Sequence, residues 1–299
     1  MEKNNKAKAH SRKEESIQQR SASLLNDDTA FAVVEAYKAA RTNIIFALGT
    51  SKGCKRIIIT SANPGEGKTT TTLNLAIAFA QMDAKVLVID GDLRKPRVYR
   101  HLQLERKGGL SDILCDLIDV KEAIHHCENH GIDCITSGQI PPNPAELLGS
   151  EAMGKLLDYL SETYDYIFID TPPVTIVTEA SVMAKYVNGV IVVARQNYTI
   201  HESLIKAREN LLFAKAKILG YILNDITTPR YGYGRYYRNY GSYHYNYEYG
   251  YSDDRSRRYG YYYGKSPEIG SDEVEEPELK SKKVPLLIRL KDKIRSRMR

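Results

Sequence analysis

The 299-residue sequence contains no tryptophan, only four cysteines and no apolar run near the ~18 residues that a membrane span needs. Cys54, Cys115, Cys127 and Cys134 are too sparse for a disulfide framework, which indicates a reducing compartment. The N-terminus is charged and lacks the apolar stretch of a secretory signal. These absences predict a soluble, cytoplasmic protein.

The net charge of +6 is unevenly distributed along the chain. Residues 281–299 carry eight Lys or Arg and one Asp, and the remainder has 35 basic and 36 acidic residues. The neutral body argues against nucleic-acid binding by charge. In the basic end, Leu287, Leu290, Ile294 and Met298 share one helical face, so this tail can lie on an anionic membrane surface or bind a partner.

After a helical pattern at 31–48, short apolar runs alternate with longer amphipathic stretches. This alternation predicts an α/β fold of the P-loop NTPase type, with a mostly parallel sheet flanked by helices. The expected strands are RIIIT (56–60), KVLVID (85–90), IDCIT (132–136), YIFID (166–170), GVIVVA (189–194) and KILGYIL (217–223). The expected helices include 68–82, 151–163 and 201–215.

Composition shifts divide the chain into five parts. Polar residues 1–28 are expected to be disordered, and 29–228 should form the folded domain. A flexible Tyr/Gly/Arg-rich extension follows at 229–265, then an acidic linker with two prolines at 266–280, and last the basic tail at 281–299.

The first expected strand runs into a phosphate-binding pattern. Gly67, Lys68 and Thr69 match the end of the P-loop pattern, although Ala62 replaces its first glycine. Lys68 can reach the terminal phosphates of ATP, and the Thr69 hydroxyl can ligate Mg²⁺. The expected ATP-binding residues are Ala62, Asn63, Pro64, Gly65, Glu66, Gly67, Lys68, Thr69 and Thr70.

Three aspartates end or follow two of the expected strands. Asp90 and Asp92 follow KVLVI, and Asp170 ends YIFID. Because ligands bind at the carboxyl ends of parallel strands, all three should face the P-loop. One can hold Mg²⁺ and another can take a proton. The candidate catalytic residues are Lys68, Asp90, Asp92 and Asp170, and the candidate metal ligands are Thr69, Asp90 and Asp170.

These motifs together resemble the bacterial tyrosine kinases linked to capsule and exopolysaccharide synthesis, over about residues 30–228. PGEGKTTTTLNLA, VLVIDGDLRKP and YIFIDTPP resemble the family's three nucleotide motifs, and SGQIPPNPAELLGS (137–150) is also typical. The resemblance implies Lys68 and Thr69 at the phosphates and Mg²⁺, Asp90 and Asp92 near the reacting centre, and Asp170 as a further Mg²⁺-linked carboxylate.

The resemblance also implies partners and a place in the cell. A ring-forming motif of the family reads Glu35, Lys38 and Arg41 here, with Lys38 in place of an arginine. The other implied partners are a transmembrane activator of the polysaccharide co-polymerase type and a protein-tyrosine phosphatase. The kinase is therefore expected in the cytoplasm, at the inner face of the membrane.

A C-terminal tyrosine cluster is typical of the same family, and here it supplies flexible acceptors for phosphate. Fourteen of the 22 tyrosines lie between 231 and 263. The expected phosphorylation sites are Tyr231, Tyr233, Tyr236, Tyr237, Tyr240, Tyr243, Tyr245, Tyr247, Tyr249, Tyr251, Tyr259, Tyr261, Tyr262 and Tyr263. We expect autophosphorylation in trans, because each such tyrosine can enter the site of a neighbouring copy.

Three other interpretations remain open from the sequence. A partition or division-site ATPase shares the fold, but many of those carry a lysine where Asn63 stands. The arginines among the tyrosines suggest a nucleic-acid-binding module, for which the signal is compositional only. HHCENHGIDC (125–134) suggests zinc, but its spacing fits no common pattern, and we expect it to span a helix end and a strand start.

Overall fold

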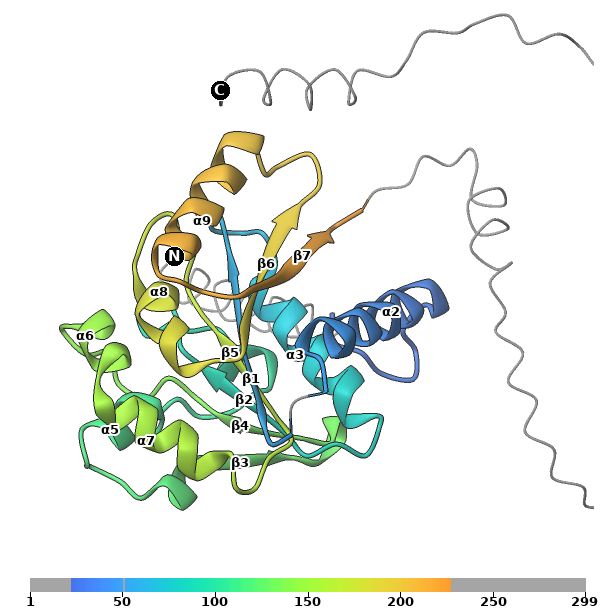
Figure 1. Cartoon of the computed structure of the whole chain (residues 1–299). Helices are drawn as coiled ribbons and strands as arrows, with labels where there is room; N and C mark the ends of the chain where they lie inside the picture. Colours follow the sequence, from blue (N-terminus) through green and yellow to red (C-terminus); the bar gives the residue numbers. More distant parts are fainter. Residues whose placement is uncertain (1–22, 51, 227–299) are drawn as a thin grey trace, which may run out of the picture. The chain divides into compact units, whose positions relative to one another are not determined.

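The computed structural model describes residues 23–50 and 52–226, which form one sheet with helices on both of its faces (Figure 1). All six expected strands are present, and a seventh joins them at the edge. The strands of this described part are β1 (Lys55–Ser61), β2 (Val86–Asp90), β3 (Ile124–Cys127), β4 (Ile132–Ile135), β5 (Tyr166–Asp170), β6 (Gly189–Arg195) and β7 (Ile218–Asn224).

Four longer helices and several short ones connect the strands. The α-helices of the described residues are α2 (Phe31–Leu48), α3 (Lys68–Ala80), α4 (Val98–His101), α5 (Leu110–Leu114), α6 (Pro144–Gly149), α7 (Glu151–Leu160), α8 (Glu179–Met183) and α9 (His201–Phe213). Short 3-10 turns lie at η1 (Val120–Ala123), η2 (Glu128–His130) and η3 (Ala184–Tyr186).

The strand order of the sheet, β3-β4-β2-β5-β1-β6-β7, brings the expected site residues to one edge. Every neighbouring pair is parallel except β3 and β4, which are antiparallel. Because β5 lies between β1 and β2, the loops that follow these three strands meet. Asp90 at the end of β2 lies in register with Asp170 at the end of β5.

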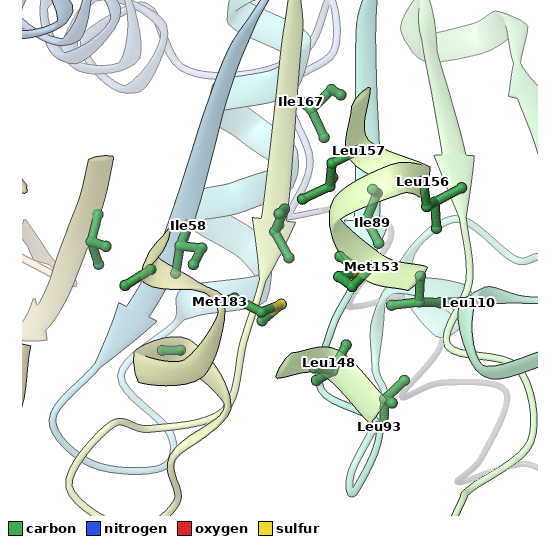
Figure 2. Close-up of a cluster of buried hydrophobic side chains, with 14 of the residues drawn as sticks. Ile58, Ile89, Leu93, Leu110, Leu148, Met153, Leu156, Leu157, Ile167 and Met183 are labelled. Atoms are coloured by element: carbon green, nitrogen blue, oxygen red, sulfur yellow. The ribbon is translucent and has the colours of Figure 1, made fainter. Parts of the chain in front are cut away.

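Each face of the sheet packs against its own group of helices. On one face, Ile57, Ile59 and Phe168 contact residues of α2 and α3. On the other face, alternate residues of the same strands contact α5 to α9. Figure 2 shows this second cluster, in which Leu156, Leu157 and Met153 of α7 lie near Ile89 and Ile167. Two buried faces explain why the strands are continuously apolar.

The structure corrects two expectations at the margins of the fold. Residues 125–127 belong to the edge strand β3, which pairs with β4, and not to the helix end that the sequence predicts. The expected disorder of 1–28 does not extend through its described end, because Leu24 and Leu25 are buried. The Asn74 side chain accepts a hydrogen bond from the Leu25 N–H at 2.9 Å and donates to the Ser23 carbonyl at 3.1 Å.

The segments 229–265, 266–280 and 281–299, with all 14 candidate phosphorylation sites, lie outside the described residues. None of the helices in the described part is both long enough and apolar enough to traverse a lipid bilayer.

Candidate active site

The loop between β1 and α3 has the shape of a phosphate cradle. Gly65 and Gly67 adopt φ values of 80° and 89°, in the left-handed region that favours glycine. Gly67 directly precedes α3, whose first residue is Lys68. The order is therefore strand β1, then the glycine loop, then the N-terminus of a helix. This is the order that binding a phosphate group requires.

A buried carboxylate holds this loop in shape from inside. Glu66 is fully buried, and its oxygens accept hydrogen bonds from the Asn63 N–H at 2.9 Å, the Asn63 amide at 3.1 Å and the Thr199 hydroxyl at 2.6 Å. Each oxygen thus has a partner, as a buried polar group requires. Glu66 and Asn63, which we expected at the nucleotide, shape the loop through their side chains.

Residues at the carboxyl ends of β6 and β7 also support the loop. The Tyr198 hydroxyl donates to the Pro64 carbonyl at 3.0 Å, and the Asn224 amide donates to the Glu66 carbonyl at 3.1 Å. A Cβ atom on Gly67 would lie 2.0 Å from the Asn224 amide nitrogen. The backbone angle therefore favours glycine at 67, and any larger residue would also displace the Asn224 side chain from its contact with the loop.

Thr69 and Asp170 form an oxygen pair beside Lys68. The Thr69 hydroxyl donates to one Asp170 carboxylate oxygen at 2.6 Å, and the Thr72 hydroxyl is 3.5 Å from the other. Burial raises the pKa of Asp170 from 3.8 to about 6, although the Lys68 charge and the Thr69 hydroxyl oppose this rise. Hydroxyl and carboxylate oxygens are suitable Mg²⁺ ligands, so this pair fits the expected metal.

Asp90 lies close to this pair but is bound to backbone. One of its oxygens accepts from the Asp92 N–H at 3.2 Å, and the other accepts from the N–H groups of Arg97 at 3.2 Å and Val98 at 3.1 Å. Burial, followed by the charges of Asp170 and Asp92, raises the pKa of Asp90 well above its usual value. Its observed contacts organise the loop between β2 and α4.

Asp92 instead faces a cavity of about 270 Å³ that it shares with Lys68, Thr69 and Thr70 of the P-loop. Its carboxylate accepts a hydrogen bond from the Lys95 N–H at 2.9 Å, and its side chain is only partly buried. Of the three candidate carboxylates, Asp92 is the one that lines this cavity.

The three expected ring-forming residues make two separate sets of contacts within the chain. Lys38 and Glu35 form an ion pair at 2.8 Å within α2, with both side chains partly exposed. Arg41 donates a hydrogen bond to the Ala78 carbonyl near the end of α3. Arg41 therefore connects two helices of the same chain.

The histidine- and cysteine-rich stretch forms part of the β3–β4 hairpin. His126 lies 2.7 Å from Asp133 across the two strands, and the Tyr164 hydroxyl donates to the other Asp133 oxygen at 2.6 Å. Within residues 23–50 and 52–226, no group of three or more His, Cys, Asp or Glu side chains is placed to hold a metal ion.

Sequence reasoning missed the three bracing residues Tyr198, Thr199 and Asn224. Thr199 follows β6 and Asn224 ends β7, so both lie at the carboxyl ends of parallel strands. The same rule that identified Asp90 and Asp170 would have identified them. Their polar side chains after apolar runs were the available signal.

Comparison with known families agrees with this geometry. A family model described as an AAA domain matches residues 54–213, which include the loop, Asp90, Asp92 and Asp170. The fold and the site together define this chain as a P-loop nucleotide-binding protein.

The individual relatives specify the class further. The tyrosine-protein kinase YwqD of Bacillus subtilis is 43% identical over 190 residues, which cover 64% of this chain and 80% of the relative. The tyrosine-protein kinase etk of Escherichia coli is 36% identical over 203 residues, 68% of this chain. This chain spans only 28% of the length of that relative.

Two solved structures resemble the described fold. The kinase domain of Escherichia coli tyrosine kinase ETK superposes with a TM-score of 0.62 at 36% identity, covering 67% of this chain and 80% of that domain. The chimerical protein CapA2B2 gives a TM-score of 0.61 at 38% identity, covering 64% of this chain and 84% of the chimera. The chain therefore belongs to the bacterial tyrosine-protein kinases, and its enzyme class is protein-tyrosine kinase.

Proposed function

We propose that this kinase transfers the γ-phosphoryl group of ATP to the tyrosines between 231 and 263 of a neighbouring copy. The observation that supports the proposal is the cavity that Asp92 lines together with Lys68 and Thr69 of the P-loop. A phosphate donor and a proton acceptor can thus meet there, and the sequence supplies 14 clustered acceptor tyrosines.

In the transfer, the phenol oxygen attacks the γ-phosphorus while the bond from that phosphorus to the bridging oxygen of ADP breaks. The phenol has a pKa near 10, so its proton must leave during the reaction. Asp92 takes this proton, because it lines the cavity. Asp90 is unsuited to the role, since backbone N–H groups occupy both of its oxygens and its raised pKa favours a bound proton.

The remaining site residues position and neutralise the phosphates. Lys68 carries a positive charge at the start of α3, next to the N-terminal backbone of that helix. Thr69 and Asp170 would hold Mg²⁺, which supplies charge neutralisation at the phosphates. Since two protein oxygens make only a partial coordination shell, phosphate and water oxygens would complete it.

The family resemblance supports a wider role in the synthesis or export of capsule and exopolysaccharide. The kinase would assemble as a ring of identical chains and would respond to a transmembrane activator of the polysaccharide co-polymerase type. That activator would hold it at the inner face of the cell membrane. The basic 281–299 segment can add contact with anionic lipid, and a protein-tyrosine phosphatase would reset the tyrosines.

The test is the formation of phosphotyrosine by the purified chain with ATP and Mg²⁺, with and without the activator. Lys68→Met should abolish the signal while circular dichroism shows an intact fold. Lys155→Met is the matched control, because Lys155 is exposed on α7 and does not line the P-loop cavity. Normal phosphotyrosine in the Lys68 variant would remove this site assignment.

A further inference from the structure

A second cavity, of about 310 Å³, adjoins the P-loop cavity and has a cationic lining. We call it the basic pocket. Its charged lining comes from the loop after β2, from α4 and from the segment that precedes α5. The cationic residues are Arg94, Lys95, Arg97, Arg100 and Arg106. Arg94, Lys95 and Arg97 also line the P-loop cavity, so the two cavities are adjacent.

Most of these charges lack an acidic partner. Arg94 pairs with buried Glu179 at 2.6 Å. Arg100 donates to the Tyr99 hydroxyl at 2.7 Å, and its guanidinium lies 5.3 Å from the Tyr99 ring centre. Among the described residues, no carboxylate forms an ion pair with Lys95, Arg97, Arg100 or Arg106. A multiply charged anion would relieve the repulsion of these four cations.

The remaining lining of the pocket is suited to an aromatic ring. Tyr99 and Pro96 form part of the wall, and Ile140 lies beside them with 53% of its surface exposed. An aromatic ring packs well against such a wall. Arginine binds phosphate through paired hydrogen bonds, and a phosphorylated tyrosine carries about −1.5 to −2 charges. Phosphotyrosine combines both features in one side chain.

The charge of the tyrosine-rich segment explains why the phosphorylated form is selected. Residues 229–265 contain seven Lys or Arg and three Asp or Glu, so the unmodified segment is positive and is repelled by the basic pocket. Each transferred phosphate adds negative charge to the segment, so that the repulsion from the basic pocket becomes an attraction at that position. On charge alone, the pocket would favour the product of the first transfer over the unmodified chain.

We propose that the basic pocket binds a phosphotyrosine of a partly modified chain and thereby presents a nearby tyrosine to Asp92 and the P-loop. Later transfers to one chain are then faster than the first. The adjacency of the two cavities supports this, because tyrosines two residues apart in an extended chain are roughly 7 Å apart. The proposal rests on the proposed kinase function and names its product as a ligand.

The test uses the full chain with the 14 clustered tyrosines changed to Phe, so that its own segment carries no phosphate. The substrates are two peptides of residues 243–251 (YHYNYEYGY), one unmodified and one phosphorylated at Tyr247. We expect kcat/KM per free tyrosine to be about tenfold higher for the phosphorylated peptide, equivalent to ~1.4 kcal/mol.

The variants separate the pocket from the catalytic machinery. Arg100→Ala with Arg106→Ala should remove the preference and leave the rate on the unmodified peptide unchanged. Arg100→Lys with Arg106→Lys should retain part of it, because lysine keeps the charge but loses the paired hydrogen bonds. Arg208→Ala is the control, since Arg208 is exposed on α9 and lines neither cavity.

Binding is measured in parallel by fluorescence anisotropy without ATP, so the pocket is tested whether or not transfer occurs. Equal binding and equal rates for the two peptides would overturn the proposal while leaving the kinase function intact. Equal binding of a peptide with Tyr247→Glu would show general attraction to acid and would also overturn it. If neither peptide is phosphorylated but the phosphopeptide binds selectively, the tyrosines are wrongly assigned as acceptors, and the assignment of the basic pocket as a phosphotyrosine site is retained.

Discussion

At the scale of single residues, Asp90 and Asp92 separate into different roles despite standing two positions apart. Asp92→Asn should lower kcat by about 100-fold or more, as expected for loss of a proton acceptor. Nucleotide binding should persist, because the P-loop is untouched. ATP binding by calorimetry and phosphotyrosine formation are the two measurements.

Asp90→Asn should behave differently. An amide nitrogen would face backbone N–H groups of Arg97, Val98 or Asp92, so one hydrogen bond or more would be lost. We expect a loss of roughly 1–3 kcal/mol in the free energy of unfolding, measured in urea. A stable Asp90 variant with the kinetic defect of the Asp92 variant would reverse the two assignments.

Asp170 should make stability depend on pH in the nucleotide-free protein. Its pKa rises from 3.8 to about 6 on folding, so the folded state binds the proton more tightly. The contribution to stability is therefore present below the unfolded pKa and is lost as pH rises toward and past 6.

Asp170→Asn removes this titration. Between about pH 4 and about pH 7, its free energy of unfolding should fall less than that of the wild type, by on the order of 2 kcal/mol. Urea titrations at several pH values measure the difference. Parallel curves for the two proteins would mean that Asp170 keeps its ordinary pKa in the folded state.

At the scale of elements, the charged side chains of helix α2 lie in two environments. Some form a partly exposed ion pair, and one contacts α3. Glu35→Ala with Lys38→Ala should leave the urea midpoint unchanged, since exposed pairs contribute little, but should reduce the mass of the proposed oligomer in light scattering.

Arg41→Ala should lower the free energy of unfolding by about 1–2 kcal/mol, because the Ala78 carbonyl loses a charged hydrogen-bond donor. Unaltered stability in the Arg41 variant would contradict a role for Arg41 in joining α2 to α3.

The elements also show what sequence can and cannot predict. YIFID coincides with β5 at both ends, since two buried faces leave one continuous apolar run between polar residues. Strand β3 was missed because its residues Ile124–Cys127 lie at the sheet edge, where partial exposure removes the apolar signal. Asp90 and Asp170 end neighbouring strands as the sequence predicts, but only Asp92 of the three carboxylates lines the P-loop cavity.

Other features of the site depend on contacts between residues distant in sequence. The position of Asn224 at the end of an apolar run indicates the carboxyl end of the sheet, but it does not indicate that its partner is the Glu66 carbonyl, 158 positions earlier. Likewise, the burial of Leu24 and Leu25 depends on an amide of α3, whereas the surrounding composition is polar. Composition predicts how a segment behaves in isolation, whereas these two contacts depend on packing against residues distant in sequence.

At the scale of the whole molecule, the two apolar clusters share one sheet and should therefore unfold together. Phe79→Ala removes a ring that packs 4.5 Å from Tyr166 and 5.2 Å from Phe168 on one face. Leu157→Ala truncates the cluster on the other face. Each should cost about 3–5 kcal/mol and shift a single common transition.

Far-ultraviolet and near-ultraviolet circular dichroism in urea measure that transition for both variants. Coincident curves at both wavelengths are expected in each case. Separate transitions, with one face melting before the other, would show that the sheet does not couple its two sides.

The contact between Asn224 and the P-loop sets a lower limit on how far the chain can be shortened. Asn224 holds the Glu66 carbonyl, and Asp225 pairs with Arg195 at 2.7 Å. A truncation that removes all the clustered tyrosines yet ends after Asp225 keeps every described brace of the loop. A cut only a few residues earlier would damage the nucleotide site from the opposite end of the sequence, and loss of activity would then be mistaken for loss of the acceptor tyrosines.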